Sequence, residues 1–246
     1  MSTRSKDCSS VSHAPVLTPQ LLSRIHQLNL EYLLLLIDTP GLNLCAHAEA
    51  MPVAIRQALG NLPQSALQML AAAPYAVYTL AFEDQDFWLA TLSGVESAGA
   101  LGLHVADSAG ASSACHLQRH AAFCETVIFF AWHVAVANRL AARVSLGMPA
   151  AVIERLQSAP FRKLQQVMRA CPWLLMPRWP SNPRFWPDLV RSAAVSNAKS
   201  VRESQLLGSQ LIASDLRLAE SPQPEVAGRL RAVRNLQLQR WKMRQR

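Results

Sequence analysis

The stretch that decides the fold occurs twice, as MPVAIRQAL in Met51–Leu59 and as MPAAVIERL in Met148–Leu156. The two copies lie 97 residues apart, and the spacing becomes 98 after one inserted residue. Further matched pairs are Pro63 and Pro160, Leu67-Gln68 and Leu164-Gln165, Pro74 and Pro172, and Phe87-Trp88 and Phe185-Trp186. Self-similarity at a nearly fixed spacing predicts two copies of one structural unit.

We place the two units at residues 18–92 and 115–220, around a Gly/Ala/Ser-rich linker at 93–114. An N-terminal segment, 1–17, is expected to be flexible, and a basic arm, 221–246, follows the second unit. Two matched units in one chain predict an intramolecular pseudodimer. A long helix closes the second unit in this scheme.

Proline at helix starts makes each unit helical, because its fixed φ suits the first helical turn. Thr18-Pro19 begins a helix that Pro40-Gly41 ends, and Met51-Pro52 and Leu62-Pro63 begin two short ones. Met148-Pro149 and Ala159-Pro160 repeat this pair of short helices in the second unit. The expected fold is therefore mostly α, with a helix-turn-helix-like corner in each unit.

The segments after the corners are expected to differ. Side chains of residues 76–92 alternate enough between apolar and polar to predict a short hairpin that turns at Glu83-Asp84-Gln85. We expect the carboxylates of this turn to be solvated, and a catalytic or magnesium-binding role is the alternative. Three prolines in 177–183 predict an extended loop there instead of a strand pair. Pro187 is expected to open one long helix toward Glu220. Phe87-Trp88 and Phe185-Trp186 are expected to anchor the core in both copies.

Composition excludes several classes of protein. With 246 residues and 50% hydrophobic residues the chain can bury a large core, so it is not generically disordered. The longest apolar runs, Leu30–Ile37 and Val127–Ala137, fall short of the ~20 residues of a membrane helix. No apolar secretory signal opens the chain, and its five cysteines are scattered, so we expect a cytoplasmic protein with reduced thiols and no membrane partner.

Positive charge is concentrated at the C-terminus. Seven of the eight net positive charges lie between residues 228 and 246, where no acidic residue occurs. The cations spread around a helix, which favours a polyanion contact over a membrane surface; a solvated tail is the alternative. The arm residues predicted to contact DNA are Arg229, Arg231, Arg234, Arg240, Lys242 and Arg244.

Signatures of catalysis are absent from the sequence. There is no nucleophile elbow, Walker loop, dinucleotide fingerprint or His-Glu-x-x-His, so we expect no enzyme and no cofactor. His116, His120 and Cys124 share one helix face, but the first and last lie ~12 Å apart along the axis. Surface histidines and a buried cysteine therefore explain them better than a zinc site, and no metal is expected.

The corner of the second unit suits nucleic acid better. Its second helix carries cations and amides that can contact phosphates and base edges, whereas the first unit offers Gln64, Ser65 and Gln68 without a cation. The predicted DNA-binding residues are Arg162, Lys163, Gln166 and Arg169. A helix pair of a purely structural core is the alternative.

Residues 21–35, LLSRIHQLNLEYLLL, resemble the opening helix of the flagellar transcriptional regulator family FlhD, with its Asn-Leu-x-Tyr-Leu-Leu-Leu run. The second unit is similar at Ala137–Val144, Leu146-Gly147-Met148, Leu156 and Leu164–Trp179. The resemblance covers over half the chain and consists mostly of apolar periodicity. The chain departs from the family in two respects: members are single units of about half this length, and the family's intersubunit cysteine has no counterpart here, because Tyr78 and Met176 fall near that position.

The resemblance implies an all-helical subunit of a transcriptional activator that works as a homodimer with a zinc-bearing FlhC-type partner. Two linked units would be a covalent version of that dimer, able to form a homo- or hetero-oligomer. Such pairs occur in bacterial flagellar regulation and on conjugative elements. We therefore expect a co-activator that binds promoter DNA together with a partner subunit.

A second interpretation is an adaptor of a bacterial secretion or conjugation system that does not bind DNA. It rests on the aromatic segment between residues 173 and 186, because aromatic residues and arginine are typical interface anchors. The residues predicted for a partner interface are Trp173, Arg178 and Trp179.

Overall fold

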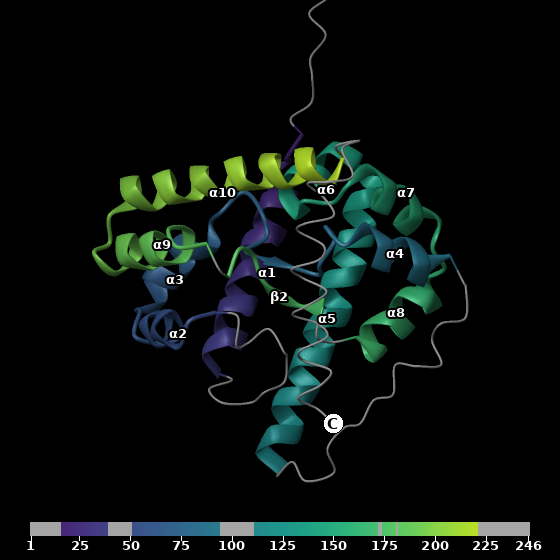
Figure 1. Cartoon of the computed structure of the whole chain (residues 1–246). Coiled ribbons are helices and arrows are strands. Elements are labelled where there is room, and N and C mark those ends of the chain that lie inside the picture. The colour runs from purple at the N-terminus through teal and green to yellow at the C-terminus, as the bar shows by residue number, and fades with distance from the viewer. Residues whose placement is uncertain (1–15, 39–50, 94–110, 172–173, 181, 221–246) are drawn as a thin grey trace, which may run out of the picture.

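Helices make up most of the chain (Figure 1), which confirms the prediction of a mostly α fold. The computed structural model describes residues 16–38, 51–93, 111–171, 174–180 and 182–220. Within these ranges the helices are α1 (Pro19–Asp38), α2 (Val53–Gly60), α3 (Gln64–Ala71), α4 (Gln85–Leu92), α5 (Ala111–Ala137), α6 (Arg139–Leu146), α7 (Ala150–Ser158), α8 (Phe161–Ala170), α9 (Phe185–Ala194) and α10 (Ala198–Ala219). Two short strands, β1 (Tyr78–Thr79) and β2 (Met176–Pro177), form an antiparallel pair.

Helices α1 and α5 run through the middle of the molecule, and the other helices pack around them (Figure 1). Thr18 caps α1 as expected, since its hydroxyl accepts a hydrogen bond from the Leu21 amide at 3.2 Å. Where α1, β1 and α5 meet, Tyr32, Tyr78 and Phe123 form an aromatic cluster with ring centroids 5.2 to 6.1 Å apart. All three residues belong to the hydrophobic core.

Helix α5 is the most apolar long helix. Its segment Cys115–Ala137 is long and apolar enough, by length and composition, to cross a membrane. The same helix packs against α1, α6, α7 and α8, and Val127, Ile128 and Ala131 on it are fully buried by them and their neighbours. A central helix of a folded core passes the same test of composition, so the finding is weak support for a membrane span.

The predicted hairpin over residues 76–92 is wrong. Only Tyr78–Thr79 is a strand, and a helix, α4, replaces the second strand. The carboxylate of Asp84 causes the change, because it accepts a hydrogen bond from the Phe87 amide at 3.2 Å and so caps α4. Trp88 is then buried, and its indole donates to the Leu80 carbonyl at 3.1 Å.

The proline-rich segment has the same local geometry, although it was expected to be a loop. Met176–Pro177 is a strand, the Asn182 side chain accepts from the Phe185 amide at 3.0 Å, and the buried Trp186 donates to the Arg178 carbonyl at 2.6 Å. The left-handed turn residues, Ala81 with φ 55° and Trp179 with φ 48°, also lie 98 positions apart. Both tryptophans are core anchors, as predicted.

The strands pair in a reversed register: Tyr78 opposes Pro177, and Thr79 opposes Met176. Since Tyr78 matches Met176 in the sequence and Thr79 matches Pro177, each strand pairs with its own counterpart in the opposite direction. The helices that follow are exchanged, because α4 packs against α7 whereas α9 packs against α2 and α3. A local two-fold axis between the strands would produce this arrangement.

Two predicted boundaries are wrong. The long helix after Pro187 is divided into α9 and α10, because Ser196 has φ 52° and the Asn197 side chain caps α10 by accepting from the Lys199 and Ser200 amides at 3.1 Å. Helix α5 begins at Ala111, so the last four residues of the predicted linker are helical. Residues 94–110 of that linker and the segment 1–15 lie outside the described residues.

Helix α10 lies across one side of the fold and approaches it most closely at Gly208. The Tyr75 hydroxyl donates to the Gln205 carbonyl at 2.9 Å, and a Cβ at residue 208 would lie 2.9 Å from Phe185 and closer still to the Tyr75 hydroxyl. Both aromatic rings are buried and cannot swing away. Close approach of the helix backbone therefore requires glycine at this position.

We predict that Gly208→Ala lowers the free energy of unfolding by about 2 kcal/mol. Close contact with two buried rings puts the cost of overpacking at the upper end of its range, about 3 kcal/mol, and the gain in helix propensity offsets about 1 kcal/mol of it. Urea denaturation of the full chain measures the change, and Ser209→Ala at the neighbouring exposed position is the control. An alanine variant as stable as the parent would contradict the close approach.

Candidate nucleic-acid interface

Helices α7 and α8 form the corner that the sequence predicted. Pro149 and Pro160 precede them, and Ala159 between them is extended, so the chain turns within two residues. The inner faces are apolar and buried; they comprise Val152, Ile153 and Leu156 on α7 and Leu164, Val167 and Met168 on α8. The corner is therefore fixed to the body by packing, and its outer face is open to solvent.

Three of the four predicted DNA-binding residues of α8 share its exposed face. Arg162, Gln166 and Arg169 follow one another at intervals of four and three residues, which places them in one row, whereas Lys163 is half-buried at its side. Arg169 also pairs with Glu125 of α5, with 2.9 Å between Nε and Oε1. Arg162 and Gln166 are thus the two most available groups of the row.

Phe161 opens α8 and is part of this surface. Its ring is 55% exposed and stacks on Phe129, with centroids 4.0 Å apart and planes 7° from parallel. Phe161 is not among the residues predicted to contact DNA, because the prediction rested on cations and amides. Only the packing of α8 against α5 shows that one face of the ring reaches solvent.

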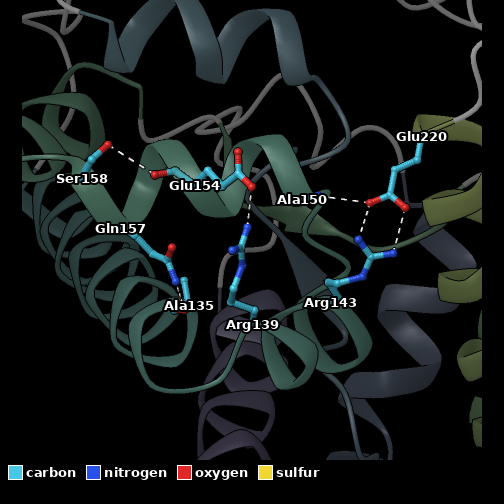
Figure 2. Close-up of polar contacts among 8 residues, drawn as sticks. All are labelled: Ala135, Arg139, Arg143, Ala150, Glu154, Gln157, Ser158 and Glu220. Atoms are coloured by element: carbon cyan, nitrogen blue, oxygen red, sulfur yellow. Dashed lines mark hydrogen bonds and ion pairs between the residues drawn. The ribbon is translucent and has the colours of Figure 1, made fainter.

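The end of α10 is held at the first turn of α7 (Figure 2). One carboxylate oxygen of Glu220 accepts from the Ala150 amide at 3.1 Å, and both oxygens bind the Arg143 guanidinium, with 2.8 Å between Nη2 and Oε2. The hydrogen bond from Arg143 lowers the pKa of Glu220 below its usual value. The basic arm, with its six predicted DNA contacts, lies outside the described residues, but its first residue follows this anchor.

Further polar contacts fix α7 to its neighbours (Figure 2). Arg139 of α6 pairs with Glu154, with 2.5 Å between Nη2 and Oε1. The Gln157 side-chain amide donates to the carbonyl of Ala135 at the end of α5, with 2.6 Å between the heavy atoms. These contacts hold α7 against α5 and α6. The candidate surface is consequently built on regular helices and not on a loop.

The corner of the first unit has a different environment. Gln64, Ser65 and Gln68 are exposed on α3, where the sequence has no cation. The carbonyl of the next residue, Met69, accepts a hydrogen bond from the Gln205 side-chain amide of α10 at 3.1 Å. Helix α9 packs against α2 and α3. The first corner therefore contacts α9 and α10, but its polar face is exposed like that of α8, and the two faces differ in charge.

Arg178 is not an exposed interface residue, which corrects the prediction for it. The side chain is buried, its Nε donates to the Tyr78 carbonyl at 3.1 Å, and its Nη2 donates to the Leu146 carbonyl. Burial lowers the pKa of the guanidinium from its usual value. Trp173 lies outside the described residues.

Trp179 is half-buried and engaged within the chain. Its indole donates to the Asp215 carboxylate at 2.7 Å, and its ring packs edge-on against Phe185 with centroids 4.7 Å apart. The adaptor interpretation required an exposed aromatic segment, and Trp186 of that segment is buried as well. The described part of the segment thus packs in the core and contacts α10.

The histidines and cysteines of α5 do not form a cluster of metal ligands. Burial lowers the pKa of His120 to about 4, and its Nδ1 lies 3.6 Å from the Sγ of the buried Cys124. Cys115, nearer the N-terminal end of α5, is exposed. In the ranges that the structure describes, no three side chains of His, Cys, Asp or Glu are grouped to hold an ion.

We predict that Glu220→Gln lowers the free energy of unfolding at pH 7 by at most about 1 kcal/mol, because the pair is one-third exposed. The folded-state pKa of Glu220 is depressed, so its contribution is present above the unfolded-state value of about 4.3 and is lost as pH falls through the folded-state pKa. Urea denaturation of parent and variant should therefore converge near pH 3. Glu154→Gln, in the more exposed pair with Arg139, is the control and should have almost no effect at pH 7.

Comparison of the chain with protein-family models, with curated proteins and with solved structures finds no match. The geometry that bears on function is the open, cationic face of α8 and the anchor from which the basic arm continues.

Proposed function

We propose that this chain is an FlhD-like transcriptional regulator, folded as an intramolecular pseudodimer, that binds promoter DNA together with an FlhC-type partner. One observation carries the proposal: the exposed row of Arg162, Gln166 and Arg169 lies on a helix-turn-helix-like corner, and Glu220 fixes the origin of a cationic arm to the same corner. Clustered cations on an exposed helix and in a separate sequence segment are typical of a protein that binds nucleic acid.

The pairing of β1 with β2 supports the pseudodimer. Each strand meets its sequence counterpart in reverse, as in an isologous interface between identical subunits. The resemblance to FlhD places the family's intersubunit cysteine near Tyr78 and Met176, and these two positions lie in the paired strands. The exchanged packing of α4 and α9 further supports two intertwined units.

Covalent linkage would let the two units specialise. A linker raises the effective concentration of one unit near the other to the millimolar range, so neither unit has to preserve a symmetric surface for assembly. The corners differ accordingly, since α8 carries cations and α3 carries none. DNA contact by the second corner alone is the consequence of the proposal.

Binding would depend on neutralisation of DNA phosphates by cations and on a few hydrogen bonds to base edges. Helix α8 has 10 residues, about 15 Å in length, and can enter the major groove, which is about 12 Å wide. Arg162 would contact phosphate there, and the Gln166 amide can pair with the edge of adenine. Each arm cation that contacts a phosphate adds salt-dependent affinity.

A partner subunit follows from the energetics. One good contact to a base edge discriminates by about 1 to 3 kcal/mol, whereas specific sites are usually favoured by about 4 to 10 kcal/mol. Gln166 with two neighbouring arginines is too small a set to supply that difference alone. We therefore assign most of the sequence selection to the FlhC-type partner.

We predict that the full chain binds random-sequence duplex DNA with a steep dependence on salt, and that a chain ending at Glu220 loses most of it. The slope of log K against log salt should fall by about 0.9 for each phosphate contact removed. Ending the chain at Glu220 preserves its bonds to Arg143 and Ala150. Fluorescence anisotropy over a salt series measures both slopes, and equal slopes would show that the arm does not contact phosphates.

We also predict that Arg162→Ala weakens DNA binding about equally for all sequences and reduces the salt slope by about 1. The matched control is Arg202→Ala, which removes an exposed arginine from α10 and should leave the slope unchanged. If the two variants behave alike, α8 is not the DNA-contacting helix.

A further inference from the structure

Exposed apolar side chains surround the point at which the chain leaves the described structure. Leu140 and Val144 lie one turn apart on the outer side of α6 and are 49% and 38% exposed. Leu218, which is 41% exposed, lies in the last turn of α10, and the pair of Glu220 with Arg143 holds that turn against α6. We name these three residues, Leu140, Val144 and Leu218, the α6 patch.

The polar groups of α6 do not explain the patch. Arg139 and Arg143 are both engaged in ion pairs, with Glu154 and Glu220, and the opposite side of the helix is packed into the core through residues such as Ala142 and Leu146. On the outer side of α6 an apolar row, Leu140 and Val144, consequently lies beside two arginines that are engaged in ion pairs. Such a strip is typical of a surface that another element covers.

We propose that the chain's own C-terminal arm covers the α6 patch, through Val226, Leu230 and Val233. These residues follow one another at intervals of four and three, the spacing of one helix face. Ser221-Pro222-Gln223-Pro224 precedes them, and its prolines prevent α10 from continuing, so the arm can turn back over α6.

The tether favours the arm over other occupants. Val226 lies six positions after Glu220, and an extended chain of that length reaches about 20 Å, whereas Leu140 and Val144 differ by only about 6 Å along the helix axis. A short tether gives the arm an effective concentration in the millimolar range. A second copy of the chain at micromolar concentration would compete with an arm whose effective concentration is about a thousandfold higher.

Docking would also orient the cations of the arm. With Val226, Leu230 and Val233 toward α6, a helical period of 3.6 places Arg229 and Arg234 on either side of the contact and Arg231 on the far side. The apolar residues of the arm are then buried while its charge faces solvent. The docking is intramolecular and does not depend on the proposed function, and its test uses no DNA.

Limited trypsin digestion of the full chain tests the proposal, with mass spectrometry used to follow the cuts after Arg229, Arg231 and Arg234. Leu140→Asp with Val144→Asp should accelerate these cuts about tenfold, because proteolysis follows the population of the undocked arm. Leu230→Asp should have the same effect from the other side of the contact. The control is Val53→Asp with Leu206→Asp, which alters equally exposed apolar residues elsewhere and should leave the cuts unchanged.

The aspartate variant could also attract the arginines of the arm. The double variant Leu140→Ser with Val144→Ser removes the apolar contact without adding charge, and it should accelerate the cuts as well. The thermal unfolding midpoint of each variant shows that the body remains folded. Cuts equally fast in the parent and in both α6 variants would overturn the proposal. Light scattering tests whether a second copy of the chain covers the α6 patch instead. A dimeric parent and monomeric α6 variants, with unchanged rates of cutting, would overturn the proposal in favour of that second copy.

Discussion

The rest of the structure depends on the buried guanidinium of Arg178. An unpaired buried charge costs several kcal/mol, so the carbonyls that surround it must be positioned accurately. Those carbonyls belong to Tyr78 in β1 and to Leu146 at the end of α6. Gly147 adopts φ 64°, and a Cβ there would lie 2.9 Å from the guanidinium. One side chain thus fixes the strand pair, the end of α6 and the turn that leads into α7.

From this point the two halves are interlocked. The Arg178 carbonyl receives the indole of Trp186, as Leu80 receives that of Trp88, so each short strand is fixed to the helix that follows it. These helices then cross to the opposite half, α4 to α7 and α9 to α2 and α3. Because α9 crosses, α10 is carried over the first half and returns to α6, where Glu220 binds Arg143.

The course of α10 makes the two halves unequal, and this inequality underlies the functional proposals. The helix covers the side of α3 and leaves the outer face of α8 open. Its end delivers the basic arm to the corner of α6 and α7, next to the exposed α6 patch and one helix away from α8. The last described residue, Glu220, is therefore held at α6 and α7, and the outer face of α8 is open.

The sequence alone determined the features that depend on neighbouring residues. These are the helix start at Pro19, the helix starts directly after Pro149 and Pro160, the corner, and the row of Arg162, Gln166 and Arg169. It also revealed the matched copies. Only the tertiary structure decided that Tyr78 pairs with Pro177 and that Arg178 is buried, because those contacts join residues far apart in the chain. Alternation suggested a hairpin where the Asp84 cap forms a helix, since local periodicity cannot weigh a cap and a buried tryptophan against strand propensity.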